Sequence, residues 1–111
     1  MNLENTKAQM RKGVLELCIL NMLAERDAYA NEIIAELKKA ELIVVEGTLY
    51  PLLTRLKNAG ILSYRWEEST SGPPRKYYTI TEIGRSALKE LILTWERLQQ
   101  AVNQSIQTDE N

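Results

Sequence analysis

One segment, residues 46–60 (EGTLYPLLTRLKNAG), constrains the fold of this chain more than any other. Its four leucines recur at i, i+3, i+4 and i+7, a spacing that places them on one face of an amphipathic helix. Tyrosine, threonine, arginine, lysine and asparagine occupy the opposite face. Gly60 follows as a C′ residue, since glycine adopts the left-handed conformation without strain. The segment predicts a helix with a polar, partly cationic outer face.

Two strand-like runs follow this helix directly. Residues 61–67 alternate in polarity, with Tyr64 and Trp66 on the apolar side, which predicts a half-buried strand. Residues 68–74 (ESTSGPP) have the composition of a loop, and residues 75–80 (RKYYTI) predict the returning strand. A polar-faced helix followed by a hairpin is typical of a winged helix-turn-helix. Such a helix fits the major groove of DNA and the hairpin fits the adjacent backbone.

Three further helices are predicted at about residues 6–25, 29–39 and 82–106. The first is apolar nearly all round after its basic start, which indicates burial on every face and hints at a second subunit. The last begins after Thr81, a natural N-cap, and would be roughly 37 Å long. Its apolar residues step by three and four, the spacing of a helix–helix seam: Leu88, Leu91, Trp95, Leu98 and Val102.

The expected fold class is therefore mainly α with a small β-hairpin. Residues 1–80 would form a winged helix-turn-helix DNA-binding domain. Residues 81–111 would form a dimerisation helix with a polar tail, the whole chain making one compact unit. A length of 111 residues suits one domain with a small core.

Composition excludes several classes of function. The chain has no histidine, and no carboxylate pair stands in a catalytic or metal-binding motif, so neither an enzyme nor a cofactor or metal is expected. The single Cys18 agrees with a reducing compartment. With no signal-peptide core and no apolar stretch that could cross a membrane, we expect a cytoplasmic protein. The net charge of −1 argues mildly against indiscriminate nucleic-acid binding, but it leaves room for a local basic face.

Two motifs carry a family resemblance. G-T-L-Y-P-L-L-x-R-L-x-x-x-G-I-L, followed by P-R-K-Y-Y-x-I-T-x-x-G, resembles the PadR family of bacterial transcriptional regulators, over nearly the whole chain from about Met10. The single terminal helix looks like the short subgroup. Trp95, R-K-Y-Y and the first-helix segment I-L-N-M-L are most similar to its multidrug-binding members. The resemblance implies a homodimeric winged helix-turn-helix repressor that binds double-stranded DNA at a two-fold-symmetric site.

The outer face of the third helix and the wing provide the expected DNA contacts. These residues are Thr48, Tyr50, Pro51, Thr54, Arg55, Lys57, Arg75 and Lys76. Several of these residues also have a purely structural interpretation: Tyr50 as a core aromatic, Thr48 as a helix cap, and Arg55 and Lys57 as solvated surface charges. Tyr50 lies off the leucine face, which favours the groove. The family wing often has arginine where this chain has Pro73, so weaker wing contacts are expected.

Trp95 leaves two interpretations open. It is either an ordinary anchor between helices, or one of two opposed rings that a planar aromatic or cationic ligand enters at the dimer interface. Helical spacing and similarity to the multidrug-binding members make Leu17, Asn21 and Gln99 its neighbours. The expected function is a homodimeric repressor released by a small planar hydrophobic ligand. The alternative is a dimeric protein-interaction or ligand-sequestering module without sequence-specific DNA binding.

Overall fold

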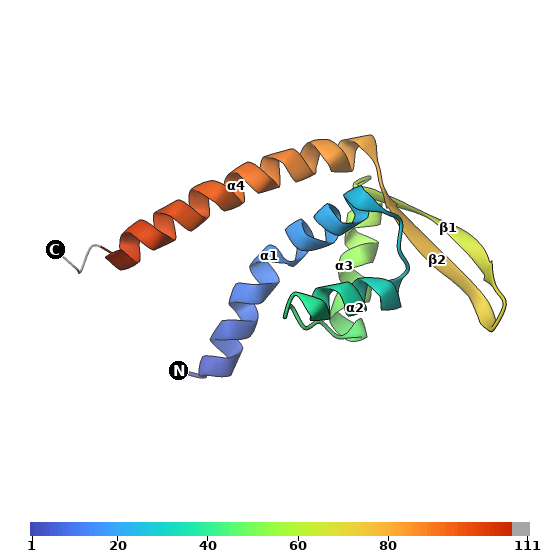
Figure 1. Cartoon of the computed structure of the whole chain (residues 1–111), viewed down its shortest axis with the longest axis horizontal. Coiled ribbons are helices and arrows are strands. Elements are labelled where there is room, and N and C mark those ends of the chain that lie inside the picture. The colour runs from blue at the N-terminus through green and yellow to red at the C-terminus, as the bar shows by residue number, and fades with distance from the viewer. Residues whose placement is uncertain (108–111) are drawn as a thin grey trace.

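The computed structural model describes residues 1–107, which form four helices and one hairpin (Figure 1). In chain order these are α1 (Leu3–Glu25), α2 (Ala30–Lys39), α3 (Glu46–Asn58), β1 (Leu62–Ser69), β2 (Gly72–Ile80) and α4 (Glu82–Gln107). The mainly helical fold class predicted from the sequence is confirmed. Apart from Gln107, the polar tail expected at residues 107–111 lies outside the described residues.

The core lies between α1, α2, α3 and the base of the hairpin. All four leucines of the α3 pattern are buried, as the helical spacing predicts: Leu49, Leu52, Leu53 and Leu56. Leu20 and Leu23 of α1 and Ile33 of α2 pack in the same cluster with almost no exposed surface. This cluster fixes how α3 is rotated, and so which of its side chains face solvent.

Two helices end in the same hydrogen-bonded cap. At the end of α3, the Gly60 N–H donates to the Lys57 carbonyl and the Ile61 N–H to the Leu56 carbonyl, both at 3.0 Å, with Gly60 at φ +79°. These bonds form a Schellman motif, with Gly60 at the left-handed C′ position that the sequence predicts. The end of α2 has the same bonds, but Glu41 occupies the left-handed position at φ +62°.

The hairpin differs from the sequence-based expectation in two ways. The strands pair antiparallel from Leu62↔Ile80 outward and continue to Ser69↔Gly72 past a bulge, so the loop predicted at 68–74 is wrong. A two-stranded sheet has only edge strands, where proline is tolerated. Tyr64 and Trp66 are exposed rather than half-buried, because the wing extends beyond the core and only its base is covered.

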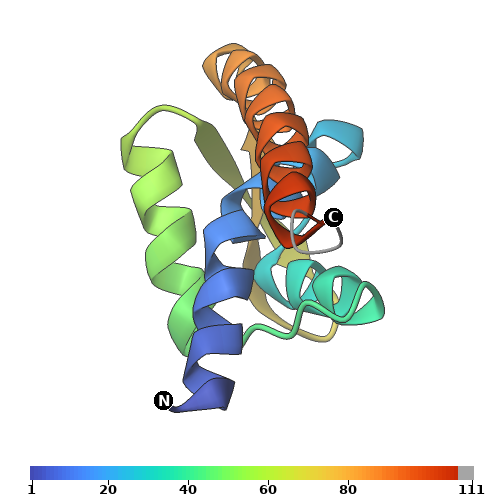
Figure 2. The same ribbon diagram turned by 90° about the vertical axis from the view of Figure 1, so that its left-hand side faces the viewer.

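Helix α4 joins the core through its first three turns, where Leu88 is buried and Leu91 packs against the core. The Thr81 side chain caps the helix as predicted, accepting from the Gly84 N–H at 3.0 Å, and it donates to the Gly60 carbonyl at 2.6 Å. A Cβ atom on Gly84 would lie 2.2 Å from the carbonyl oxygen of Ile61, so glycine is required for this close approach. Figure 1 shows the later turns of α4 running away from the other helices, and Figure 2 shows α4 pointing toward the viewer, in front of the body.

Helix α1 begins earlier than predicted and is less buried. Its N-cap is Asn2, whose side chain accepts from the Asn5 N–H at 3.1 Å, so the helix starts at Leu3 rather than at Thr6. Most of its first 13 residues, which include the basic start, are exposed in the single chain, Met10 among them at 73%, whereas Ile19 and Leu20 are buried. Burial of the remaining apolar surface by a second subunit stays a prediction. Over the described part of the chain, no helix combines the length and apolar character that spanning a membrane would require.

Candidate nucleic-acid interface

The outer face of α3 is open to solvent beside the wing. Tyr50 is 46% exposed, which rules out a place in the core, and Thr54 and Lys57 are also exposed. Thr48 is half-buried in the first turn of the helix, after an N-cap at Val45, so it does not cap the helix. The leucines face inward, and α3 therefore presents tyrosine, threonine and lysine outward.

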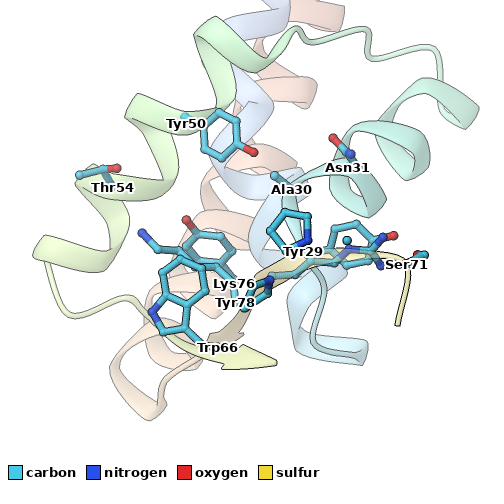
Figure 3. A pocket seen from close by; sticks show the side chains of 13 residues that line it. Tyr29, Ala30, Asn31, Tyr50, Thr54, Trp66, Ser71, Lys76 and Tyr78 are labelled. Atoms are coloured by element: carbon cyan, nitrogen blue, oxygen red, sulfur yellow. The ribbon is translucent and has the colours of Figure 1, made fainter. Parts of the chain in front are cut away.

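A concave surface, here called the wing cleft, separates α3 from the wing. Its volume is about 510 Å³. It is lined by Tyr29, Ala30 and Asn31 at the start of α2, Tyr50 and Thr54 of α3, and Trp66, Ser71, Gly72, Pro73, Pro74, Arg75, Lys76 and Tyr78 of the hairpin and its turn. Figure 3 shows Tyr50 and Thr54 on one side of this cleft, with Lys76 and Trp66 opposite. The cleft thus combines side chains that the sequence predicted for DNA contact from α3 and from the wing.

The cations of the cleft lie over aromatic rings. The Arg75 guanidinium is 4.4 Å from the centre of the Tyr29 ring. The Lys76 ammonium is 4.5 Å from the centre of the Tyr64 ring and 5.4 Å from that of Trp66. Each such contact at an exposed site is worth about 0.5–1 kcal/mol. The rings therefore restrict where these two charges point without removing them from solvent.

The aromatic residues of the wing cleft were not predicted from the sequence. Tyr29 and Trp66 line the cleft and hold its cations, yet neither was among the predicted DNA contacts. The available signal was the pairing of Trp66 with Lys76 across the hairpin. Cross-strand partners have adjacent side chains, so a correct register would have brought the two together.

Polar contacts tie the wing to the turn between α1 and α2. Ala28 and Tyr78 exchange both backbone hydrogen bonds, at 3.2 and 2.8 Å. The Asp27 carboxylate accepts from Arg65 of β1. A hydrogen bond from the Thr79 side chain, supported by Arg65, lowers the pKa of Asp27 below its ordinary value. The base of the wing is therefore fixed relative to the start of α2.

The predicted ligand residues are only partly brought together. Leu17 and Trp95 line a cleft of about 100 Å³ between α1 and α4. Leu17 also lines a neighbouring open cleft of about 450 Å³ with Asn21 and Ile92, and Gln99 is exposed on α4. Pockets for drug-sized ligands are typically 300–1,000 Å³. The cleft beside Trp95 in a single chain is therefore too small to enclose a planar dye.

The buried leucine face, the exposed polar face of α3 and the cationic wing define the class of protein: a DNA-binding protein of the winged helix-turn-helix type. Comparison with known proteins gives the family. The model of the PadR-like family of transcriptional regulators matches residues 19–90. The chain belongs to this family, whose members regulate transcription and are not enzymes.

Relatives agree in sequence and in fold. The PadR-like transcription factor of Bacteroides fragilis is 61% identical, with a TM-score of 0.75 over 90% of this chain and 97% of that one. A PadR family regulator of Eggerthella lenta is 31% identical, with a TM-score of 0.87 over 96% and 93% of the two chains. The transcriptional regulator Rv3488 of Mycobacterium tuberculosis is 32% identical over 74% of this chain and 76% of its own.

Proposed function

We propose that this DNA-binding regulator is a homodimeric repressor. In this proposal, α3 of each subunit lies in the major groove of one half of a two-fold-symmetric site, and the wing contacts the adjacent backbone. The first and last helices hold the dimer. A planar hydrophobic molecule bound at the interface releases the DNA. The observation that carries the proposal is the wing cleft, where the polar face of α3 adjoins the paired cations of the hairpin.

The chemistry of the cleft suits a division of roles. Tyr50 and Thr54 carry hydroxyl groups on the outward face of α3, where they would contact base edges. Arg75 and Lys76 stand on the hairpin, where they would contact phosphates. Phosphate contacts orient a protein on the duplex and base contacts provide specificity. We therefore assign specificity to α3 and general affinity to the wing, with Pro73 limiting the latter.

The uncovered side of α4 supports the dimer. Trp95, Leu98 and Val102 recur on one face and are 38%, 52% and 47% exposed. An apolar stripe of this length on one helix is typical of a protein interface. A second chain that covers this stripe would also add walls to the cleft beside Trp95, which is too small for a planar ligand in a single chain. A two-fold dimer would bring a second Trp95 to the same place.

The test begins with a random-pool selection for duplexes that bind the protein. We expect a two-fold-symmetric consensus with half-sites about 34 Å apart. Tyr50→Ala should reduce the preference for this consensus over random DNA. Lys76→Ala should weaken both about equally and should reduce the dependence of binding on salt, because one phosphate contact is lost. Failure to enrich any sequence would contradict the proposal.

The ligand is tested by fluorescence in the Trp66→Phe variant, where Trp95 is the remaining tryptophan. Planar dyes should quench its emission saturably at about one ligand per dimer, since a site on the two-fold axis is shared. By linkage, the dye and the DNA should weaken each other's binding by the same factor. Trp95→Ala should abolish dye binding and preserve the dimer. Unchanged Trp95 emission would make this residue a packing anchor.

One alternative has a specific observation in its favour. The chain has a net charge of −1, and Pro73 stands in the wing where the family motif often has arginine. A dimeric protein-interaction or ligand-sequestering module would need no phosphate-binding cation at that position. This alternative predicts a stable dimer that binds dye or protein and enriches no DNA sequence. The same selection therefore separates the two functions.

A further inference from the structure

Arg55 differs from the other polar residues of α3, because it makes an ion pair with α1. Its guanidinium donates to the carboxylate of Glu16. Tyr50 and Lys57 instead lie toward the wing, since Tyr50 lines the wing cleft and Lys57 is 5.8 Å from the centre of the Tyr64 ring. The recognition helix thus carries its two cations on different sides, and a carboxylate faces one of them.

This ion pair is open to solvent and contributes little to folding. The side chain of Arg55 is 69% exposed and that of Glu16 is 38% exposed. Exposed pairs of this kind typically contribute about 0.2–1 kcal/mol to stability. Its consequence for binding is larger, because arginine pairs bidentately with guanine and with phosphate. While Glu16 accepts from it, Arg55 cannot offer the same donors to DNA.

We propose that Glu16 is an affinity-limiting residue, which competes with DNA for the guanidinium of Arg55. The inference rests on the proposed placement of α3 in the major groove. There, any contact of Arg55 with a base or a phosphate has to replace its pair with Glu16. The pair therefore lowers the affinity for every duplex that Arg55 contacts, through Arg55 and not through repulsion between Glu16 and DNA.

Glu16→Gln tests this role, because it keeps the size of the side chain and removes its charge. Binding is measured by fluorescence anisotropy on the selected operator and on a scrambled duplex, over a range of salt. We expect both duplexes to bind more tightly, by up to about fivefold, the factor that corresponds to the upper end of the range for an exposed pair. The operator should gain at least as much as the scrambled duplex, because the better partner of Arg55 benefits fully from the loss of the competing carboxylate.

Two controls separate this role from a general loss of negative charge. Glu90→Gln makes the same charge change on an exposed part of α4 and should alter neither duplex's binding. The second control repeats Glu16→Gln in an Arg55→Gln background, where it should have no further effect. Equal tightening in both backgrounds would show direct repulsion between Glu16 and DNA, and would overturn the inference.

The remaining outcomes are also decisive. Unchanged affinity of Glu16→Gln for both duplexes, with wild-type binding still selective, overturns the inference and leaves the proposed function intact. A wild type that does not distinguish operator from scrambled DNA contradicts the proposed function and removes the basis of the inference with it. The urea midpoint of Glu16→Gln should stay close to that of the wild type, so any change in binding reflects the folded protein.

Discussion

Two regions of this molecule differ in how far their apolar side chains are buried. The head, residues 14–91, buries most of its large aliphatic residues: Leu20, Leu53 and Ile33 are at most 1% exposed. The arm, residues 92–107 of α4, leaves its own exposed, with Leu98 at 52% and Ile106 at 68%. Both have regular helical patterns in sequence. The difference indicates that the head forms its core alone, whereas the core of the arm has to be completed by another surface.

The comparison also separates the two proposed activities. The head holds the wing cleft, and its recognition helix is oriented by leucines that α1 and α2 cover. The arm holds Trp95, beside a cleft of about 100 Å³. DNA recognition would therefore be built into the folded head, and ligand recognition would depend on dimerisation. Changes in the arm can alter regulation without unfolding the DNA-binding surface.

The largest expected effect comes from the same truncation made in both regions. Leu53→Ala should lower the free energy of unfolding by about 2–5 kcal/mol, because it leaves a cavity in a close-packed core. Leu98→Ala removes the same atoms from an exposed position and should cost much less when measured at low protein concentration, where dimers dissociate. Urea denaturation followed by circular dichroism gives both values. Equal losses at low concentration would show that the arm is part of the core of the head.

The next effect is on association. Leu98→Asp would bury a carboxylate without a partner in the proposed dimer interface, which costs several kcal/mol. Sedimentation at micromolar concentration should show a wild-type dimer and a monomeric variant, and the variant should keep the helical circular dichroism of the head. Leu93→Asp is the matched control, because Leu93 is 50% exposed but lies off the Trp95 stripe by helical spacing. A dimeric Leu98→Asp protein would mean that another surface forms the interface.

A smaller effect concerns the contact that ties the wing to the head. The folded state lowers the pKa of Asp27, through the Thr79 hydrogen bond and then through Arg65. Its contribution to stability is therefore complete above the unfolded pKa of about 3.9 and is lost as the pH falls through the lowered folded value. Asp27→Asn should be slightly less stable than the wild type at pH 7 and equally stable at the lowest pH. A difference that persists there would assign the effect to packing rather than to charge.

The sequence predicts the elements of the head well, because their signals are local. The leucine spacing of α3, the cap at Gly60 and the Thr81 hydroxyl each depend on residues close in the chain. The pairing of Arg55 with Glu16 joins residues 39 positions apart on two exposed surfaces, and no periodicity indicates it. The aromatic contacts of Lys76 depend on the hairpin register, which the loop-like composition of residues 68–74 concealed.

The smallest expected effect is a gain in stability at the end of α2. Glu41 adopts φ +62° in the same capping motif where α3 has glycine. A side chain in the left-handed conformation costs roughly 1 kcal/mol, and glycine removes this cost but also loses more entropy on folding. The two terms offset in part, so Glu41→Gly should raise the free energy of unfolding by only about 0.5 kcal/mol.

Gly60→Ala makes the opposite change in the equivalent position of α3 and should lower stability, since φ is +79° there and a Cβ would meet only the end of the Ile83 side chain at 4.0 Å. Paired urea titrations of the two variants, at one protein concentration, therefore separate the contribution of backbone conformation to the free energy of unfolding from that of packing. DNA affinity should remain unchanged in Glu41→Gly, because the substitution preserves the turn that leads into α3. If Glu41→Gly instead destabilises the protein, the Glu41 side chain must stabilise the fold by more than its left-handed backbone conformation costs. The α2–α3 turn would then depend on a contact of that carboxylate rather than on the capping bonds alone.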